Sequence, residues 1–132
     1  MPDYIQQLAP QIYHSRWGET VQLEQVADDM DTISAMVDAS DEARYAIIID
    51  MTATRNYPMN VNGLVRVARA DPRIKAFIFI NGDKTAKFLG NLLKSLSKHD
   101  LKFVESEEEA LNIIGLAIKQ GINFFEYFYI LS

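Results

Sequence analysis

The sequence contains no cysteine, only two histidines and no long apolar run. Without cysteine, a disulfide framework, a thiol nucleophile and a cysteine-ligated zinc site are excluded. Two histidines are too few for a histidine-rich metal site. The longest apolar stretch, residues 124–131, is interrupted by Glu126 and is far shorter than the roughly 20 residues that a membrane-spanning helix needs. We therefore expect no metal, no cofactor and no membrane span.

The remaining composition is that of an ordinary globular protein. The 132 residues are 48% hydrophobic and 23% charged, which suits one domain with a sizeable core. Residues 1–10 have neither a basic start nor an apolar run, so they do not resemble a signal peptide. We expect a cytoplasmic protein with one domain over residues 1–132. Its core covers about residues 11–122, and residues 123–132 form an apolar extension.

Charge is distributed unevenly along the chain. The net charge of −5 combines −8 in residues 1–50, +7 in residues 51–102 and −4 in residues 103–132. Acidic and basic helices on different faces of one sheet, or complementary surfaces on two subunits, would explain this pattern. Alternatively, the basic middle of the chain binds an anionic partner. The acidic pI of about 4.9 argues against a general nucleic-acid-binding domain.

Hydrophobic periodicity predicts strands and helices in alternation. The run Tyr45–Asp50 is apolar up to its last residue and is dominated by β-branched isoleucine, as in strands that helices cover on both faces. We expect strands over residues 11–17, 45–50, 74–80 and 102–105. Helices are expected over about 20–41, 60–70, 84–98 and 107–120. This order predicts an α/β fold with a mostly parallel sheet of about four strands.

The expected helices have identifiable ends and faces. Thr20 is a candidate N-cap for the first helix, and Ser106 with Glu109 forms a capping box for the last. In the third helix we expect an apolar face composed of Phe88, Leu89, Leu92, Leu93 and Leu96. An exposed basic stripe follows Lys87, Lys94 and Lys98. In the first helix we expect Asp28, Asp29 and Asp31 to be in solvent.

The isolated histidines and the tryptophan have ordinary structural explanations. We expect His14 to be a half-buried strand residue and His99 a solvated residue at a helix C-terminus. Trp17 is expected to pack in the core or at its rim. A Ser–His–carboxylate triad would need these groups together, and the sequence has no Gly-x-Ser-x-Gly turn.

The end of the chain is unusually aromatic. Five aromatic side chains are concentrated in residues 123–132: Phe124, Phe125, Tyr127, Phe128 and Tyr129. An exposed terminus does not usually have this composition. The segment either packs on its own domain or contacts a second copy of the chain. We predict the second arrangement, a homodimer.

Candidate binding residues follow the expected parallel strands, because such sheets bind ligands at the carboxyl ends of their strands. Those residues are Asp50, Thr52, Thr54, Asn81, Lys84 and Thr85. Asp50 lacks the acidic pair that a phosphoryl-accepting aspartate needs to hold magnesium. Its simplest role is to accept backbone N–H groups of the following loop. Gly82–Thr85 lacks the second glycine of a phosphate-binding loop, although Lys84 and Thr85 at a helix N-terminus are suited to a small anion.

Several segments together resemble the SpoIIAA-like group of STAS domains, which shares its architecture with CRAL-TRIO lipid-binding domains. These segments are Arg16–Thr20, the strand ending in Asp50, Pro58 in the following loop, and Ser106–Leu111. The resemblance covers about residues 11–118. It implies helices packed on a mostly parallel sheet, with an antiparallel strand at one edge.

The resemblance also implies a function. STAS-type anti-sigma-factor antagonists dock on a partner kinase and carry an Asp-Ser-x-Gly-Leu stretch whose serine is phosphorylated. The matching residues here are Asn60, Val61, Asn62, Gly63 and Leu64. Val61 has no hydroxyl, so only the hydroxyls of the preceding loop, on Thr52 and Thr54, are available as substitutes.

We therefore predict a non-enzymatic regulatory module that binds a protein partner. Asn60, Asn62 and Gly63 join the six strand-end residues as its candidate contacts, and the Lys87–Lys98 stripe adds to the docking surface. The alternative is a small-molecule or lipid-binding domain with a pocket at the same strand ends. An enzyme would have Asp50 and Lys84 as its only plausible acid–base pair.

Overall fold

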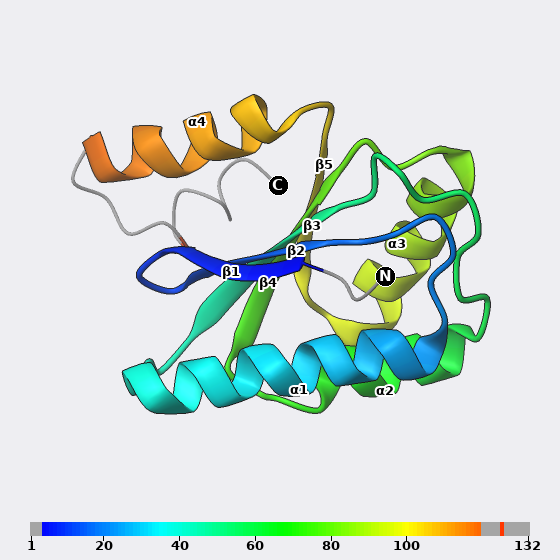
Figure 1. Cartoon of the computed structure of the whole chain (residues 1–132), viewed down its shortest axis with the longest axis horizontal. Coiled ribbons are helices and arrows are strands. Elements are labelled where there is room, and N and C mark those ends of the chain that lie inside the picture. The colour runs from blue at the N-terminus through cyan, green and yellow to red at the C-terminus, as the bar shows by residue number, and fades with distance from the viewer. Residues whose placement is uncertain (1–3, 120–124, 126–132) are drawn as a thin grey trace.

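The computed structural model describes residues 4–119 and Phe125 (Figure 1). Within these residues, five strands form one sheet in the order β1-β2-β3-β4-β5. They are β1 (Tyr4–Ala9), β2 (Ile12–Arg16), β3 (Tyr45–Asp50), β4 (Ile74–Ile80) and β5 (Asp100–Val104). The helices are α1 (Leu23–Ser40), α2 (Val61–Arg69), α3 (Lys84–Ser97) and α4 (Glu107–Lys119). The predicted α/β architecture is confirmed.

β1 adds a fifth strand to the expected four. It pairs antiparallel with β2, whereas all other neighbouring strands are parallel. The strand is half-exposed and has no continuous apolar run, which explains why periodicity did not reveal it. Gln11 makes the turn between β1 and β2 with a positive φ of 68°, and its N–H donates to Glu42 Oε1 at 3.1 Å. An antiparallel edge agrees with the implied architecture.

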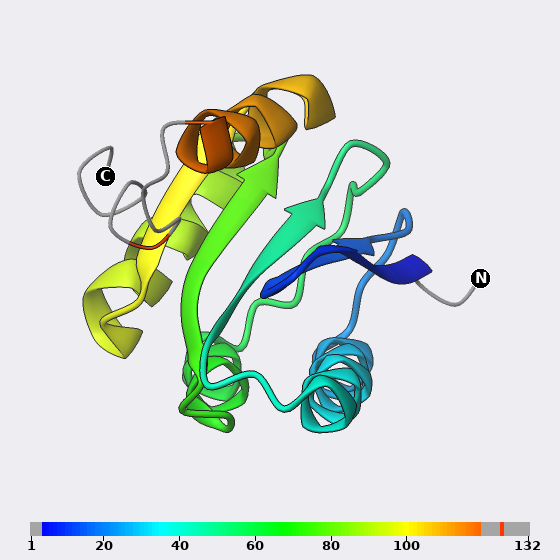
Figure 2. The same ribbon diagram turned by 90° about the vertical axis from the view of Figure 1, so that its left-hand side faces the viewer.

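Helices cover both faces of the sheet, and each face has its own core. α1, α2 and α3 pack on one face, around Tyr13, Ile47 and Phe77, while α4 packs on the other, around Ile48 and Ile78. Figure 2 shows α4 on the opposite side of the sheet from α1 and α2. All six residues of β3 are buried, as expected for a central strand between two helical layers. Trp17 is buried in the first core, as predicted.

α3 is rotated relative to its expected orientation. Leu89 is buried, but Phe88 is 61% exposed and Leu96 is 50% exposed. Small residues face the sheet instead, because a Cβ added at Gly90 would lie only 2.4 Å from Phe103 Cζ. The expectation that Phe88 and Leu96 belong to the buried face was wrong. The close approach of helix and strand at Gly90 decides the rotation.

Two expected helix caps have different outcomes. α1 begins at Leu23 after Gln22, whose side chain makes no capping hydrogen bond, so the assignment of Thr20 was wrong. Thr20 instead pairs with Asn56 in an isolated bridge. At α4, Glu109 N–H donates to Ser106 Oγ at 3.0 Å, and Glu109 Oε2 accepts from Glu105 N–H at 2.9 Å. The predicted capping pair is therefore present, except that the Glu109 carboxylate accepts from the N–H of Glu105 and not from that of Ser106.

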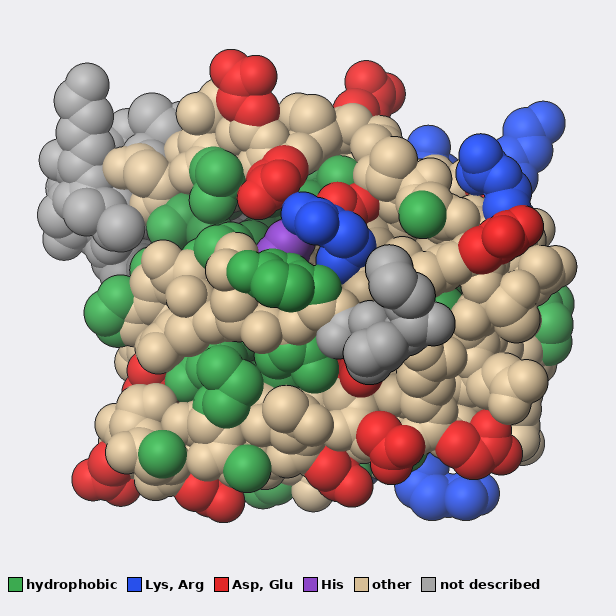
Figure 3. Space-filling model, in the orientation of Figure 1, with side chains coloured by type: hydrophobic (Ala, Val, Ile, Leu, Met, Phe, Trp, Pro, Cys, Tyr) green, Lys and Arg blue, Asp and Glu red, His purple; other side chains and the backbone are tan. Residues whose placement is uncertain are grey.

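The acidic surface of the first half of the chain follows α1. In the space-filling view, Asp and Glu side chains line the lower edge of the molecule over this helix (Figure 3). Asp28 and Asp31 are exposed, as predicted. Asp29 is buried instead, since it lies next to Met30 on the side of the helix that meets the sheet. Its expected place in solvent was therefore wrong.

Both histidines are more buried than expected. His14 is fully buried, and no hydrogen-bond partner of its ring nitrogens is found among the described residues. His99 is half-buried, with its ring centroid 5.3 Å from that of Phe77. Burial lowers the pKa of both rings; for His99 the nearby positive charges of Lys75 and Arg69 lower it further. The solvated position expected for His99 was wrong, because the residue turns back toward β4.

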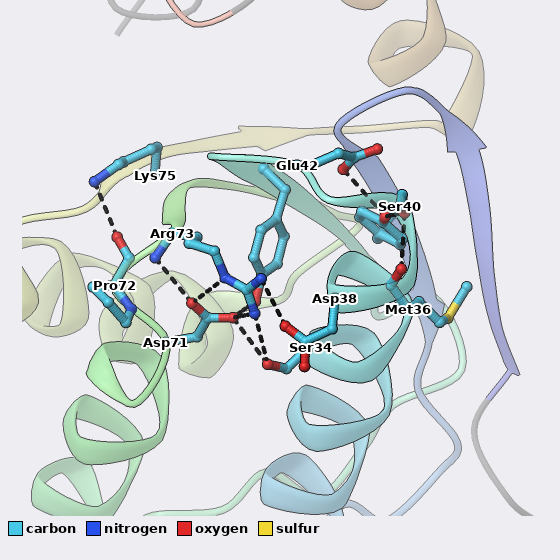
Figure 4. A network of polar contacts seen from close by, with 11 residues as sticks. Ser34, Met36, Asp38, Ser40, Glu42, Asp71, Pro72, Arg73 and Lys75 are labelled. Atoms are coloured by element: carbon cyan, nitrogen blue, oxygen red, sulfur yellow. Dashed lines mark hydrogen bonds and ion pairs between the residues drawn. The ribbon is translucent and has the colours of Figure 1, made fainter.

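A polar network fastens α1 to the start of β3 and β4 (Figure 4). Asp71 Oδ2 accepts from Tyr45 Oη at 2.7 Å, from Ser34 Oγ at 3.0 Å and from Arg73 Nη2 at 2.8 Å. Arg73 Nη1 also pairs with Asp38 Oδ1 at 2.8 Å. Burial alone would raise the pKa of Asp71, but the hydrogen bonds from Arg73, Tyr45 and Ser34 hold it well below its usual range.

Replacing Asp71 by Asn should therefore destabilise the domain. Loss of the charged acceptor leaves Arg73 without its principal partner, and we expect the unfolding free energy to fall by about 2–3 kcal/mol. Asp38→Asn is the matched control, because Asp38 is mostly exposed and should contribute less than about 1 kcal/mol. Urea denaturation measures both values. Equal losses in the two variants would contradict this account of the network.

His14 should make the domain sensitive to mild acid. Its folded-state pKa is lowered, so the unfolded chain binds the proton first as the pH falls below about 6.5. We expect the unfolding free energy to decrease between pH 7.5 and pH 5.5. In His14→Gln this decrease should be smaller, whatever the absolute stability of the variant. Denaturation curves at both pH values test this, and an unchanged pH dependence would show that His14 is not responsible.

Candidate functional site

The parallel register brings the ends of three strands to one edge of the sheet. Arg16 at the end of β2 lies opposite Asp50 at the end of β3, which lies opposite Ile80 at the end of β4. Each strand is followed by a loop at this edge. The candidate residues Asp50 and Asn81, which are 31 positions apart in the sequence, are therefore neighbours in space, as the strand-end argument predicted.

A chain of polar contacts connects these strand ends. Arg16 Nε lies 3.7 Å from Asp50 Oδ2. Asp50 Oδ1 accepts from the backbone N–H of Thr52 at 2.9 Å and from its hydroxyl at 2.5 Å. Asn81 Nδ2 then donates to Thr52 Oγ1 at 3.0 Å, from a residue with a left-handed φ of 56°. Asp50 thus holds its loop in shape, as its simplest explanation predicted.

In this geometry Asp50 stabilises the loop and is not a free acid or base. Its ion-pair partner is Arg16, a residue that the sequence did not indicate, and not Lys84. Its Oδ1 is occupied by the two hydrogen bonds from Thr52, and its Oδ2 faces Arg16 Nε. The sequence places Arg16 near the end of a strand. Only the register of β2 on β3, which sets Arg16 opposite Asp50, shows that its side chain reaches this carboxylate.

The two threonines of the loop differ in accessibility. Thr52 is exposed, whereas Thr54 is 1% exposed. The backbone N–H of Thr54 donates to Met51 O at 3.0 Å, which places the residue inside the turn. A partner or a modifying enzyme can therefore reach Thr52 but not Thr54 in this conformation.

The first turn of α2 combines structural and accessible residues. Asn60 is its N-cap, and Asn60 Oδ1 accepts from Gly63 N–H at 2.9 Å. Gly63 is buried, and a Cβ there would lie 2.4 Å from Leu23 Cδ2 and 3.1 Å from Asn60. Gly63 is thus the point where α2 approaches the start of α1. Asn62 is exposed and free of these constraints, so it is the better probe of binding.

α3 begins at the same edge. Asp83 is its N-cap, with Oδ1 accepting from Ala86 N–H at 3.0 Å. Lys84 and Thr85 follow in the first turn, and both are exposed. The sequence indicated these two residues but not the capping role of Asp83. The candidate residues of the strand ends and of the two helix starts therefore lie along one edge.

An apolar cavity lies behind this edge, between α2, α3 and the sheet. It has a volume of about 40 Å³, and its lining includes Trp17, Met51, Tyr57, Pro58, Leu64 and Phe79. Burial raises the pKa of the Tyr57 hydroxyl, and the charge of Asp83 raises it further. Sequence reasoning did not identify this cavity, because its walls come from elements far apart in the chain. Tyr57 and Pro58, which directly follow the polar residues Arg55 and Asn56, were the available signal.

Two large apolar side chains are exposed close to the candidate residues in sequence. Met59, directly after the cavity-lining Pro58, is 62% exposed. Phe88 lies one helical turn after Lys84 and is 61% exposed. Both residues extend from elements that line the cavity. Exposed apolar side chains beside polar ones are typical of surfaces that bind proteins.

The described residues contain no group of histidine and acidic side chains suited to hold a metal ion. Within the same part of the chain, no helix is long and apolar enough to cross a membrane. Of the predicted dimer contacts, Phe125 lies in the core beneath α4, with Arg44 Cζ 4.6 Å from its ring centroid. It therefore packs on its own chain, whereas we predicted it at a contact between two copies. Phe124, Tyr127, Phe128 and Tyr129 lie outside the described residues.

Comparisons with known proteins bear on the fold. No family model and no curated protein matches the sequence. The structure is similar to the phosphorylated form of the Bacillus cell fate determinant SpoIIAA, with a TM-score of 0.57. The two sequences are 16% identical, and the match covers 85% of this chain and 98% of SpoIIAA. The chain therefore has a SpoIIAA-like fold, as the resemblance of its sequence implied.

Proposed function

We propose that this protein is a non-enzymatic regulatory module that docks on a partner protein. The contact is the carboxyl-edge surface, which we define as Thr52, Met59, Asn62, Lys84 and Phe88. The observation that carries the proposal is the combination of exposed apolar side chains, Met59 and Phe88, with exposed polar residues on two adjacent helix starts. The SpoIIAA-like fold, which is shared with a cell fate determinant, supports a regulatory role.

The chemistry of this surface indicates what a partner must offer. Met59 and Phe88 favour an apolar projection on the partner, since burying such side chains contributes about 1.5–3 kcal/mol each. Lys84, with Lys87 beside it, favours acidic side chains around that projection. Neither lysine has an ion-pair partner among the described residues. A partner with an acidic rim therefore adds attraction without having to displace an existing pair.

The docking proposed here does not depend on phosphorylation at the start of α2. The position that carries the serine in related domains is Val61, which has no hydroxyl. Thr54 is buried, and the hydroxyl of Thr52 is bonded to Asp50 and Asn81. We propose that the surface is competent to bind in its unmodified form.

The cavity is a weaker basis for the alternative function, binding of a lipid or other small molecule. Its volume is about 40 Å³. Sites for drug-sized ligands occupy roughly 300–1,000 Å³. A lipid would require α2 and α3 to separate, which would expose Leu64, Phe79 and Leu93. The protein-docking function needs no such rearrangement.

Asn62→Arg should abolish partner capture without unfolding the domain. The residue is exposed, and a large charged side chain there obstructs the carboxyl-edge surface. Asn112→Arg is the matched control, because Asn112 is exposed on α4, over the opposite face of the sheet. We expect immobilised wild-type protein and Asn112→Arg to retain the same partner from lysate and Asn62→Arg to retain at least about 10-fold less. Equal retention by both variants would reject the assigned surface.

We also propose that the protein forms a homodimer through the aromatic residues Tyr127, Phe128 and Tyr129. Truncation after Phe125 removes all three and keeps the ring that packs in the core. Native mass spectrometry should give twice the chain mass for the full-length protein and the single-chain mass for the truncated one. A full-length monomer, or a truncated protein that stays dimeric, would rule out this contact.

A further inference from the structure

A polar hollow lies at the opposite end of the sheet from the carboxyl-edge surface. It has a volume of about 300 Å³, several times that of the apolar cavity. Its walls come from the end of α2, the turn into β4 and the end of α3. The lining residues include Arg69, Asp71, Pro72, Lys75, Lys98 and His99. We refer to it as the amino-edge hollow.

Three cationic side chains from three different elements surround this hollow. Arg69 is the last residue of α2, Lys75 is the second residue of β4, and Lys98 is the C-cap of α3 with a left-handed φ of 65°. All three are exposed, and none forms an ion pair with a described residue. The fold thus gathers cations that are up to 29 positions apart in the sequence.

Helix geometry explains only part of this arrangement. Cations are commonly found at helix C-termini because they offset the helix dipole, and this accounts for Arg69 and Lys98. Lys75 is on a strand, where no such dipole exists. Its Nζ donates to Pro72 O at 3.0 Å, which keeps the ammonium at the hollow with two further N–H donors. The third cation therefore needs another explanation.

The one carboxylate in the wall does not neutralise these charges. Asp71 Oδ1 accepts from Arg73 N–H and from Arg73 Nε, each at 2.9 Å. Asp71 Oδ2 accepts from Ser34, Tyr45 and Arg73. The charge of Asp71 is thus compensated by Arg73, which itself is not a lining residue. Arg69, Lys75 and Lys98 leave the hollow with a net positive charge.

His99 adds a titratable ring to the same wall. Ser97 Oγ donates to Leu93 O at 2.6 Å, so His99 Nδ1, at 2.8 Å, is the donor toward Ser97 Oγ. The charged groups around the ring are Arg69 on α2, Lys75 on β4, Lys98 on α3 and Asp100 on β5. Burial and the cations hold its pKa below the usual value. An anion in the hollow would oppose that effect.

We propose that the amino-edge hollow binds a small, multiply charged phosphate compound through Arg69, Lys75 and Lys98, beside His99. Three unpaired cations around a hollow of this size suit a ligand with at least two phosphate charges. This site would account for part of the basic charge of residues 51–102. It is separate from the carboxyl-edge surface, since the two lie at opposite ends of β4. Lys98, which we expected to add to the docking surface, belongs to the hollow instead.

Pyrophosphate is a suitable probe for this proposal. Calorimetry on the full chain should show saturable binding of one pyrophosphate per chain. Lys75→Gln and Arg69→Gln should each weaken it at least about 10-fold. Arg66→Gln is the matched control, because Arg66 is exposed on the same helix but does not line the hollow. We expect its affinity to stay within about two-fold of wild type.

Two outcomes of this titration would overturn the proposal. Absence of saturable binding at low ionic strength would show that the hollow has no affinity for phosphate groups. An equal loss in Arg66→Gln and Arg69→Gln would show diffuse attraction to the basic surface instead of a site. Circular dichroism of each variant establishes that it is folded, so a loss of affinity is not a loss of structure.

A second measurement locates the ligand within the molecule. The two histidine rings give separate NMR signals. His14 is two residues after Ile12 in β2, so it lies on the same face as Ile12, which packs in the core on the α4 side. Pyrophosphate should raise the pKa of His99 and leave that of His14 unchanged. A pKa of His99 that does not move while binding is observed would place the ligand elsewhere and reject the hollow as its site.

Discussion

Asp71 and Arg73 connect α1 with the amino ends of strands β3 and β4, and the positions of the other elements depend on this connection. Their contacts reach Ser34 and Asp38 on α1 and Tyr45 at the start of β3 (Figure 4). A parallel sheet has long crossover connections, so nothing local fixes where a helix meets the next strand. The Asp71 carboxylate, which accepts several hydrogen bonds, supplies this link. It aligns the first residues of β3 and β4 with each other.

Because the first residues of β3 and β4 lie side by side, their last residues do so as well. The register continues from Tyr45 opposite Ile74 to Asp50 opposite Ile80. The two ends of the sheet then have different surfaces. At the carboxyl ends of the strands lie loops and helix starts, together with the exposed side chains of Met59 and Phe88. At the amino ends lie cationic side chains from the ends of α2 and α3. The proposed protein contact and the proposed anion site therefore do not overlap.

The candidate site was predictable to the extent that it depends on strand order. Asp50 and Asn81 were recognised because parallel strands end at a common edge. Arg16, Asp83 and the cavity under Tyr57 were not recognised, since side-chain direction and helix spacing do not follow from periodicity. Gly63 was expected at a binding surface, and the structure shows that it lies against Leu23. A sequence shows that a glycine is present, but only the packed structure shows what lies beside it.

The sequence by itself determined the order of the strands and helices that follow β1. Examples are the buried strand Tyr45–Asp50 and the helix start at Ser106 and Glu109. These features depend on local periodicity and on hydrogen bonds within a few residues. Tertiary structure alone decided the burial of His99 and Asp29 and the exposure of Phe88. Each depends on the rotation and distance of one element relative to another, which distant contacts such as Gly90 with Phe103 determine. The pairing of Arg73 with Asp38 across 35 positions has the same cause, because only folding brings the two charges together.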